Sequence, residues 1–526
     1  MARREKISAV DTAWLRMDRP GNLMMICGVM FFRQRVDFAR LRAVIEKRWL
    51  QFGRFYQRPI QSAAAAFWET DDTFDLEQHV VHVALPGKAG KKELQTFVSR
   101  LAATPLDPAH PLWQFHLVED VDGGSALIAR IHHCYADGIA LVQVILSMTD
   151  SAENGPPAMS APPGRKRRPA GEDNALGELS QPLADALGLA RKVGAALIDN
   201  GSELLQHPEK AIALAEQVGS LTGEIAKLAL MGQDSPTRFK GTPGVAKCVA
   251  WAEPLPLDEV KTVCRALGAS VNDVLLSCVA GALREYLVGK GDATDGVMMR
   301  ALVPINLRPL EKAYKLGNQF GVVFLELPIG IENPVERLYA VRANMRSLKG
   351  SFQPVLTLGL LAAAGAGPKM VQDLLIVVLA RNATAVMTNV PGPQQPLYMA
   401  GRKIDRFMFW VPQSGDIGMG VSILSYNGEV QFGLITDRGL VPDPERVIAH
   451  FGPEFEKLVL TTLLSPWPRQ GELDPEVAAR AVSWGPTVQS AKGKRTIASR
   501  RMRPTHRASR YKISARRPRR TPSRAP

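Results

Sequence analysis

Two apolar segments flank a heptapeptide, residues 132–138, with the sequence HHCYADG. The segment before it, residues 125–131, is short and β-prone, which predicts a buried strand. The segment after it, residues 139–146, is apolar almost throughout and is long enough for a buried helix. Two histidines therefore stand at a strand-to-helix junction, where rigid elements on both sides would fix a catalytic side chain.

The two histidines are expected to differ in their surroundings. Adjacent side chains of an extended strand point to opposite faces, so one of His132 and His133 should face a cavity while the other packs inward. Imidazole titrates near physiological pH, so a neutral histidine is available there as a general base.

Other chemistries have less support in the sequence. A metal site would need further ligands, and the GxSxG motif of a serine hydrolase is absent. Cys134 follows His133, but neighbours on a strand diverge, which argues against a thiol–imidazole pair. What remains is a single histidine that removes a proton from an acceptor during direct transfer, a task worth ~10²–10⁴-fold in rate.

The length of the chain predicts more than one domain, because 526 residues exceed what a single hydrophobic core usually supports. We expect a mixed α/β domain over 1–150, a Pro/Gly/basic linker over 151–180, a helical connector over 181–240, a second α/β domain over 241–465 and a basic tail over 466–526. Strands in the second domain are expected at 298–304, 320–327, 383–389, 418–426 and 429–436.

The excess of positive charge lies in the tail. Residues 491–526 contain fourteen Lys or Arg and no Asp or Glu, which leaves 51 basic against 51 acidic residues in 1–490. The tail is interpreted as a solvated extension, with binding to anionic lipid headgroups as the alternative. Nucleic acid is not expected as a partner, because proteins that bind single strands place aromatic side chains among their basic ones. Tyr511 is the only Phe, Tyr or Trp in residues 491–526.

The five cysteines are odd in number and widely spaced, which favours a reducing compartment without a disulfide framework. No CxxC or Cys/His spacing occurs, so no structural zinc site is expected. The N-terminus lacks the uncharged core of a signal peptide, and no membrane-spanning helix is expected. These features predict a cytoplasmic protein, either soluble or peripheral.

Several motifs in a fixed order resemble a known family. The HHxxxDG pattern of residues 132–138 is similar to that of the coenzyme A-dependent acyltransferase superfamily. Six further segments narrow the resemblance to the bacterial wax ester synthase/diacylglycerol acyltransferase (WS/DGAT) family, and the whole set covers roughly residues 7–465. These segments are ISAVDTAWL at 7–15, PLW at 111–113, ND at 272–273, VPINLR at 303–308, LGNQFG at 316–321 and TNVPGP at 388–393.

The resemblance implies an α/β fold of two chloramphenicol-acetyltransferase-like domains, each a mixed sheet flanked by helices, with a tunnel between them. It implies that His133 is the general base, and His132, on the opposite face of the strand, is then interpreted as a packing or orienting residue. Asp137 would pair with an arginine, for which Arg308 and Arg54 are both candidates.

Gly138 and Asn272 complete the predicted site, and Trp113 lies in the PLW motif outside it. Gly138 would allow the tight turn into the following helix. Asn272 is interpreted either as the N-cap of a helix over 274–287 or as part of the reaction centre. Trp113 is expected to be a core residue. No metal and no cofactor are expected, and acyl-CoA would be a co-substrate.

The implied activity is acyl-CoA-dependent transfer of a long-chain fatty acyl group to diacylglycerol, to a long-chain alcohol or to both, without an acyl-enzyme. One alternative is transfer to an amine or a carrier-bound acceptor. Another is a non-catalytic protein of the lipid-droplet surface. The expected location is cytoplasmic, with peripheral association with membranes or lipid droplets.

Overall fold

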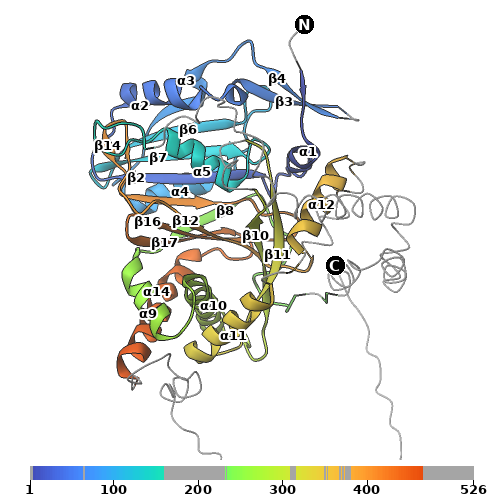
Figure 1. Cartoon of the computed structure of the whole chain (residues 1–526), viewed down its shortest axis with the longest axis vertical. Coiled ribbons are helices and arrows are strands. Elements are labelled where there is room, and N and C mark those ends of the chain that lie inside the picture. The colour runs from blue at the N-terminus through green and yellow to red at the C-terminus, as the bar shows by residue number, and fades with distance from the viewer. Residues whose placement is uncertain are drawn as a thin grey trace, which may run out of the picture. The chain divides into compact units, whose positions relative to one another are not determined.

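The computed structural model describes residues 4–62, 65–158, 231–232, 234–308, 316–348, 351, 353–366, 369, 372 and 381–465. Over these residues the chain forms two large mixed sheets and the helices that pack on them (Figure 1). The helices expected in the 181–240 connector, most of the 151–180 linker and the 466–526 tail lie outside the described residues.

The sheet of the N-terminal half has five strands in the order β15-β2-β7-β6-β5. Only β5 and β6 run parallel, so the sheet is mixed. The strand and helix predicted around the heptapeptide are confirmed, because β7 ends at His132 and α5 begins at Gly138. Every residue of β7 is buried, as expected for a central strand. The strands are β2 (Met25–Phe32), β5 (Val80–Ala84), β6 (Trp113–Val121), β7 (Gly124–His132) and β15 (Arg406–Trp410).

The sheet of the C-terminal half has the order β11-β10-β12-β16-β17-β8, and the short β9 (Leu255–Pro256) also pairs with β17. Strands β10, β12 and β16 run parallel and the other pairs antiparallel. The five strands predicted in this half are confirmed, while β8 was not predicted. Their bounds are β8 (Lys247–Trp251), β10 (Met299–Asn306), β11 (Phe320–Leu327), β12 (Ala385–Pro391), β16 (Met419–Tyr426) and β17 (Glu429–Asp437).

Strand β15 joins the two halves of the chain. It follows β12 in sequence, yet it pairs antiparallel with β2 of the N-terminal sheet, with Trp410 opposite Cys27 and Arg406 opposite Phe31. The sequence did not predict this crossing, because pairing with a strand some 380 positions away leaves no local signal. The boundaries 1–150 and 241–465 stay predictions.

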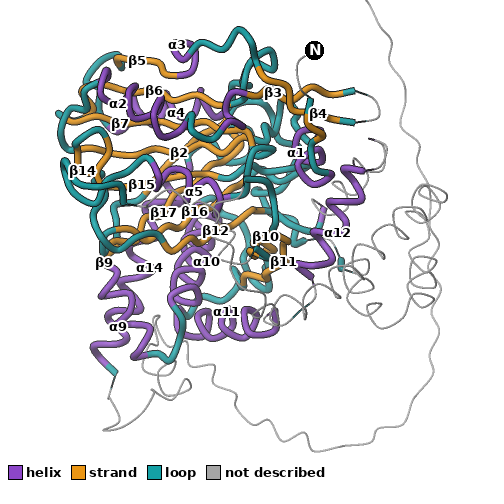
Figure 2. Tube along the Cα trace, turned by 45° about the horizontal axis from the view of Figure 1, so that its top comes forward, coloured by secondary structure: helices purple, strands orange, loops and turns teal. Residues whose placement is uncertain are grey.

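Helices pack on both sheets and tie the halves together (Figure 2). Helix α10 packs against α14 and α11 in the largest apolar core, which also contains inward side chains of β16 and β17. Helix α4 contacts β8, and α1 contacts α12. The helices are α1 (Ala9–Arg16), α2 (Phe38–Val44), α3 (Leu76–His79), α4 (Lys91–Ala102), α5 (Gly138–Ser147), α9 (Leu257–Ala266), α10 (Val271–Gly289), α11 (Pro334–Leu348), α12 (Gln353–Ala366) and α14 (Pro444–Leu464).

The smaller elements lie around these layers. A three-stranded sheet has the order β1-β4-β3, and a two-stranded sheet joins β13 to β14. Their bounds are β1 (Glu5–Lys6), β3 (Gln57–Gln61), β4 (Ala66–Thr70), β13 (Tyr398–Met399) and β14 (Arg402–Lys403), with a π-helix at Ile45–Trp49 and a 3₁₀ helix at Gly53–Tyr56.

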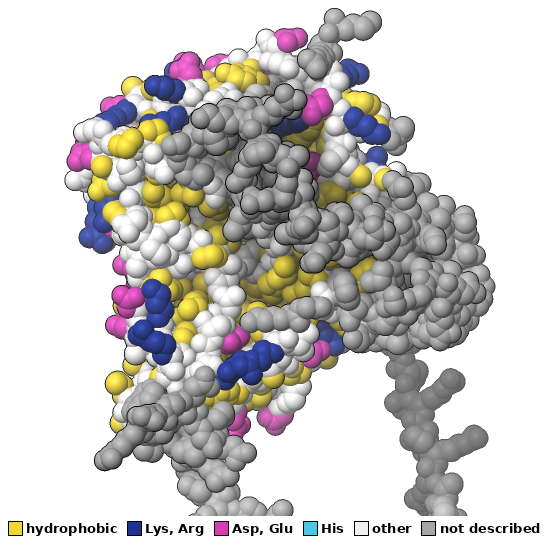
Figure 3. All heavy atoms as spheres, viewed as in Figure 1, with side chains coloured by type: hydrophobic (Ala, Val, Ile, Leu, Met, Phe, Trp, Pro, Cys, Tyr) yellow, Lys and Arg dark blue, Asp and Glu magenta, His cyan; other side chains and the backbone are white. Residues whose placement is uncertain are grey.

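On the face drawn in Figure 3, the described acidic and basic side chains are interspersed among hydrophobic ones. This surface agrees with the balanced charge of residues 1–490. Among the described helices, none is by itself long and apolar enough to cross a bilayer. Only α9 and α10 together reach the required length and composition, and they are bent by 99°.

Candidate active site

The loop that follows β7 is held on two sides by backbone hydrogen bonds. On one side the His133 N–H donates to the carbonyl of Met24 at 2.7 Å. On the other side Gly317 pairs with the loop, since its N–H donates to Tyr135 and its carbonyl accepts from Asp137. Gly317 has a φ of +106°, a backbone conformation that a side chain disfavours. The loop therefore has little freedom before it enters α5.

The rings of His132 and His133 occupy different environments, although both side chains are buried. His133 stacks on Trp14 with ring centroids 4.3 Å apart and lies 5.6 Å from Phe320. His132 accepts the N–H of Cys134 at its Nδ1, at 3.1 Å, and its ring borders a cavity. His132 thus braces the loop, while His133 lies between two aromatic rings.

Burial keeps both imidazoles neutral. It lowers the pKa of His133 to about 4, against the opposing effects of the Asp137 charge, the His133 carbonyl and Asn318. Burial also lowers the pKa of His132 to about 3, and the neighbouring His133 lowers it further. A neutral imidazole at physiological pH has the lone pair that a general base requires.

Asp137 is fixed by an ion pair with Arg308, one of the two predicted partners. Its Oδ2 lies 2.9 Å from the Arg308 guanidinium and accepts the N–H of Gln319 at 3.0 Å, and the ion pair is almost wholly buried. Its Oδ1 caps α5 by accepting the N–H of Ala140. The other candidate, Arg54, pairs with Glu5 instead. Asp137 therefore ties the loop to both the helix and the 317–319 segment.

Asp11 and Asn318 form a buried network that the sequence analysis did not assign to the site. The Asn318 side-chain amide donates to Asp11 at 2.7 Å and to the His133 carbonyl at 2.8 Å. Asp11 and Trp14 lie three residues apart on α1, so one helix supplies both the carboxylate and the ring that stacks on His133. Both residues lie within recognised motifs, but their contact with the histidine depends on tertiary packing.

A cavity of about 460 Å³ lies beside His132 and is called the His132 cavity below. Its wall combines apolar side chains with a few polar ones. It is lined by Leu15, Arg16, Asp18, Leu23, Met25, Pro59, Gln61, Ser62, Pro105, Leu106, Pro108, Leu112, His132 and Lys369.

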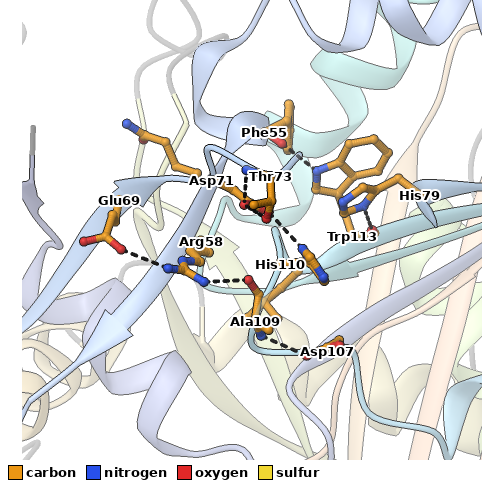
Figure 4. A network of polar contacts seen from close by, with 12 residues as sticks. Phe55, Arg58, Glu69, Asp71, Thr73, His79, Asp107, Ala109, His110 and Trp113 are labelled. Atoms are coloured by element: carbon orange, nitrogen blue, oxygen red, sulfur yellow. Dashed lines mark hydrogen bonds and ion pairs between the residues drawn. The ribbon is translucent and has the colours of Figure 1, made fainter. Parts of the chain in front are cut away.

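Polar contacts hold the segment that forms one wall of this cavity (Figure 4). Arg58 donates to the carbonyl of Ala109 at 2.8 Å, and the His110 ring pairs with Asp71 at 2.9 Å. Trp113 is fully buried and donates its indole N–H to the carbonyl of Phe55. The prediction that Trp113 is a core residue is confirmed.

A second cavity, of about 100 Å³ and almost entirely apolar, lies between α5, the N-terminal sheet and residues near β15 and β16. Gly138 lines it, and a Cβ at that position would meet no atom within 4 Å. Its φ is not in the left-handed region, so the turn into α5 does not need a backbone conformation reserved for glycine, and the role predicted for Gly138 stays a prediction. The absent side chain leaves open space beside the loop.

Asn272 is not the N-cap of its helix. Helix α10 begins at Val271, and Ser270 caps it by accepting the N–H of Asp273, whose carboxylate returns a bond to Ser270. Asn272 is exposed and accepts a hydrogen bond from Asn389 of β12 at 2.7 Å. Within the described part of the chain, no contact joins Asn272 to His133.

The thiol of Cys134 is fully buried, and burial raises its pKa well above the usual value. It therefore stays protonated and is not available as a nucleophile. Over the described ranges, no group of three or more His, Cys, Asp or Glu side chains is arranged to hold a metal ion.

Two protein-family models match most of the chain. The chain matches the wax ester synthase/diacylglycerol acyltransferase catalytic domain over residues 7–275 and the WS/DGAT C-terminal domain over residues 316–459. A Mycobacterium tuberculosis protein named as a probable diacylglycerol O-acyltransferase is 29% identical over 406 residues, which cover 75% of this chain and 81% of that protein. A Mycobacterium bovis protein with the same activity in its name is 30% identical over 420 residues, which cover 76% and 79%.

Solved structures show the same fold. The wax ester synthase/diacylglycerol acyltransferase from Marinobacter aquaeolei VT8 has a TM-score of 0.60 at 22% identity and covers 88% of this chain and 100% of that chain. The first condensation domain of the calcium-dependent antibiotic synthetase has a TM-score of 0.53 at 12% identity and covers 88% and 96%. The predicted two-domain mixed α/β fold is confirmed, while the tunnel between the domains stays a prediction. Together with the family match over more than half of its length, this shows that the chain belongs to the WS/DGAT acyltransferase family.

Proposed function

We propose that the protein is an acyl-CoA-dependent O-acyltransferase that transfers a long-chain fatty acyl group to diacylglycerol, to a long-chain alcohol or to both. The observation that carries this proposal is the position of His133 in a member of this family. The side chain is neutral and stacked on Trp14, and its loop is held by the Asp137–Arg308 pair.

In the proposed reaction His133 acts as a general base. Its Nε2 takes the hydroxyl proton of the acceptor, and the oxygen attacks the thioester carbonyl. The carbon–oxygen bond forms, the carbon–sulfur bond breaks, and the proton passes from His133 to the departing thiolate of coenzyme A. No acyl-enzyme forms, which agrees with the buried, protonated thiol of Cys134.

The relatives and the cavities support the proposed substrate class. The curated relatives carry diacylglycerol O-acyltransferase in their names, and a starter condensation domain with a TM-score of 0.51 was solved with C8-CoA. The apolar cavity beside Gly138 suits hydrocarbon, and the His132 cavity offers both apolar and polar walls. The proposal includes peripheral association of the protein with membranes or lipid droplets, because both acceptors dissolve in lipid.

The test uses the purified full-length chain with labelled palmitoyl-CoA and either dioleoylglycerol or hexadecanol. We expect labelled ester and release of coenzyme A thiol with at least one acceptor, and the ratio between acceptors gives the preference. His133→Gln should lose the activity by about 10²–10⁴-fold, the usual contribution of a positioned base. His450 lies on α14 and not in the loop that follows β7. His450→Gln is therefore the matched control and should keep full activity.

A wild-type rate no higher than that of His133→Gln would reject the enzymatic proposal and favour a non-catalytic lipid-surface protein. Thiol release with an amine or a carrier-bound acceptor, but with neither lipid, would favour the alternative acyl transfer. An inactive but folded Cys134→Ala variant would point to a thiol mechanism.

A further inference from the structure

Two aromatic side chains lie against the imidazole of His133. Trp14 of α1 stacks on it almost in parallel, with ring centroids 4.3 Å apart and an interplanar angle of 18°. Phe320 of β11 lies 5.6 Å from it at a tilt of 45°, and the rings of Trp14 and Phe320 are 5.7 Å apart. A helix, a strand and the loop after β7 therefore bring three rings together at the proposed base.

Trp14 is held in this position by its helix. Asp11, three residues earlier on α1, accepts hydrogen bonds from the backbone and the side chain of Asn318. Helix α1 also packs on α12 at Gly365, where the backbones approach closely. The indole therefore meets His133 from an element that is fixed at two places.

The charge that His133 acquires as a base is not stabilised by a carboxylate of its own. Burial, the largest influence, lowers its pKa to about 4, and the charge of Asp137 opposes this effect only in part. The Asp137 carboxylate is itself paired with Arg308. Among the described residues, the ion pairs that involve a histidine use His82, His110 and His132.

An aromatic face can supply the missing stabilisation. A cation within about 6 Å of the ring centroid is attracted to the negative π face, and tryptophan gives the strongest attraction among the aromatic side chains. The distances from His133 to Trp14 and to Phe320 both lie inside this range. The attraction is larger where water is excluded, and His133 is only 5% exposed.

We propose that Trp14 takes part in catalysis, because its π face stabilises the imidazolium that forms when Nε2 of His133 takes the proton of the acceptor. Phe320 adds a weaker contact of the same kind. This inference rests on the proposed role of His133 as the base, and it names the group that stabilises the charged form of that base.

The contact has its largest effect during the reaction. The imidazole is neutral while substrate binds and becomes a cation only when the proton is transferred. An interaction that is stronger in the transition state than in the ground state acts on kcat rather than on KM.

The first test changes the π face of Trp14 without changing its shape. Full-length protein is made with tryptophan or with mono-, di- or trifluorotryptophan at position 14 alone, since fluorine withdraws electron density from the ring. We expect kcat in the ester-forming assay to fall stepwise, by about 3- to 30-fold over the series, with KM unchanged.

The same series at Trp251 of β8 is the matched control, because the aromatic neighbours of Trp251 are Phe31 and Trp410 and not a histidine. Its kcat should stay constant. Equal kcat values across the series at position 14 would overturn the proposal.

The second test separates the π face from simple shielding of the ring. Trp14→Leu keeps an apolar side chain but has no π face, whereas Trp14→Phe keeps a weaker one. We expect a lower kcat for Trp14→Leu and partial recovery for Trp14→Phe. The acidic limb of kcat/KM against pH should lie at the same or lower pH in Trp14→Leu, because the imidazolium has lost a stabilising contact.

A role in shielding alone predicts the opposite sign. Admitting water to the ring would raise the pKa of His133 toward its ordinary value, and a limb that moves up toward pH 6.5 would overturn the proposal. The charges near the ring are the same in all these variants, since β11 contributes Phe320 and α12 (Gln353–Ala366) contains no titratable residue. The unchanged groups are Asp11 on α1, His132 at the end of β7, Cys134 and Asp137 in the loop, and Arg308.

The protonation of His133 provides a readout that does not depend on turnover. Carbon spectra of the full-length protein labelled with ¹³C at Cε1 of histidine follow the titration of His133, identified by the signal lost in His133→Gln. We expect its pKa to fall as fluorine is added at position 14. A constant pKa and a constant kcat, in a protein that His133→Gln inactivates, would overturn this inference alone. An inactive wild type in which the pKa falls across the series would overturn only the proposed reaction.

Discussion

His133 combines two properties that usually oppose each other, because burial that keeps an imidazole neutral also weakens it as a base. Its pKa is lowered to about 4, mainly by burial. The proton that it accepts is therefore held weakly and is readily passed on to the thiolate. Trp14 stacks on the ring at 4.3 Å and can stabilise the transient imidazolium through its π face.

The lowered pKa of His133 determines how turnover should depend on pH. A free imidazole would lose its lone pair below about pH 6.5. Because the pKa of His133 is lowered to about 4, kcat/KM should stay level through pH 6.5 and decline only toward pH 4. Initial rates with palmitoyl-CoA across this range provide the measurement.

Stability needs to be followed in the same buffers. The unfolded chain accepts protons at its histidines below about pH 6.5, whereas native His132, His133 and His116 resist protonation until about pH 3–4. The stability that these histidines contribute is present above pH 6.5 and is lost as pH falls toward 4. An acidic limb near pH 6.5 in a protein that is still fully folded would contradict the lowered pKa of His133.

At the scale of single elements, the loop after β7 depends on a buried charge pair. Asp137 and Arg308 are each less than 5% exposed. Replacing Asp137 removes the carboxylate that neutralises the buried Arg308 guanidinium, so Asp137→Asn should lower the free energy of unfolding by about 3–5 kcal/mol. Denaturant unfolding measures this change.

The surface pair of Arg33 and Asp405 is the control for that measurement. Arg33 is 84% exposed, so Arg33→Gln should cost about 1 kcal/mol or less. The double variant Asp137→Asn with Arg308→Gln should cost less than the sum of its two single changes. Strictly additive costs would show that the two side chains do not act as a pair.

The contact between α1 and α12 depends on a glycine. A Cβ at Gly365 would lie 1.7 Å from the carbonyl oxygen of Ala9, a distance that no packed atom tolerates. Gly365→Ala should therefore push α1 away and displace Trp14 and Asp11 from the site. We expect reduced kcat together with a lower melting temperature.

A glycine-to-alanine substitution in another helix separates the clash at Gly365 from the general effect of replacing a helical glycine. Gly452 lies in α14, and a Cβ there would meet no atom within 4 Å. Gly452→Ala should leave activity unchanged and should affect stability much less than Gly365→Ala, because only the ring of the following Pro453 restricts a side chain there. Equal behaviour of the two variants would argue against close packing of α1 on α12.

Local patterns predicted the elements whose formation depends on residues close together in the chain. Apolar runs predicted β7, α5 and the five strands of the C-terminal half, since each buries a continuous face. Ser270 and Asp273 also have the spacing of a capping box, a local signal that marks the start of α10.

Contacts between residues that are distant in the sequence could not be predicted from local patterns. The motif indicated the two histidines and Asp137, but Asp11 and Asn318 are 307 positions apart and meet only in the folded protein. Arg308 and Arg54 were indistinguishable as partners of Asp137, because the choice depends on how the 317–319 segment docks on the loop. The crossing of β15 was missed for the same reason.

At the scale of the whole molecule, the C-terminal end carries two features suited to a lipid surface. Leu463 and Leu464, at the end of α14, are 70% and 77% exposed. They precede a chain segment whose last 36 residues contain fourteen Lys or Arg and no acidic residue. Exposed leucines and a polybasic segment provide apolar insertion and attraction to anionic headgroups.

Truncation after residue 470 should therefore reduce binding to liposomes that contain phosphatidylserine, while activity on soluble short-chain substrates is kept. Cosedimentation measures the binding, and added salt should weaken it for the full-length protein. Leu463→Ser with Leu464→Ser separates insertion from charge. Equal binding by the full-length and truncated proteins would exclude the tail as an anchor.

The crossing of β15 also has a consequence during biosynthesis. The N-terminal sheet lacks its edge strand β15 until residue 410 has left the ribosome. The edge of β2 that pairs with β15 therefore stays unpaired while most of the chain is synthesised. An exposed edge of this kind recruits other strands and favours aggregation. A nascent fragment that ends before Arg406 is thus a natural client for chaperones, and expression of the N-terminal half alone should give insoluble protein.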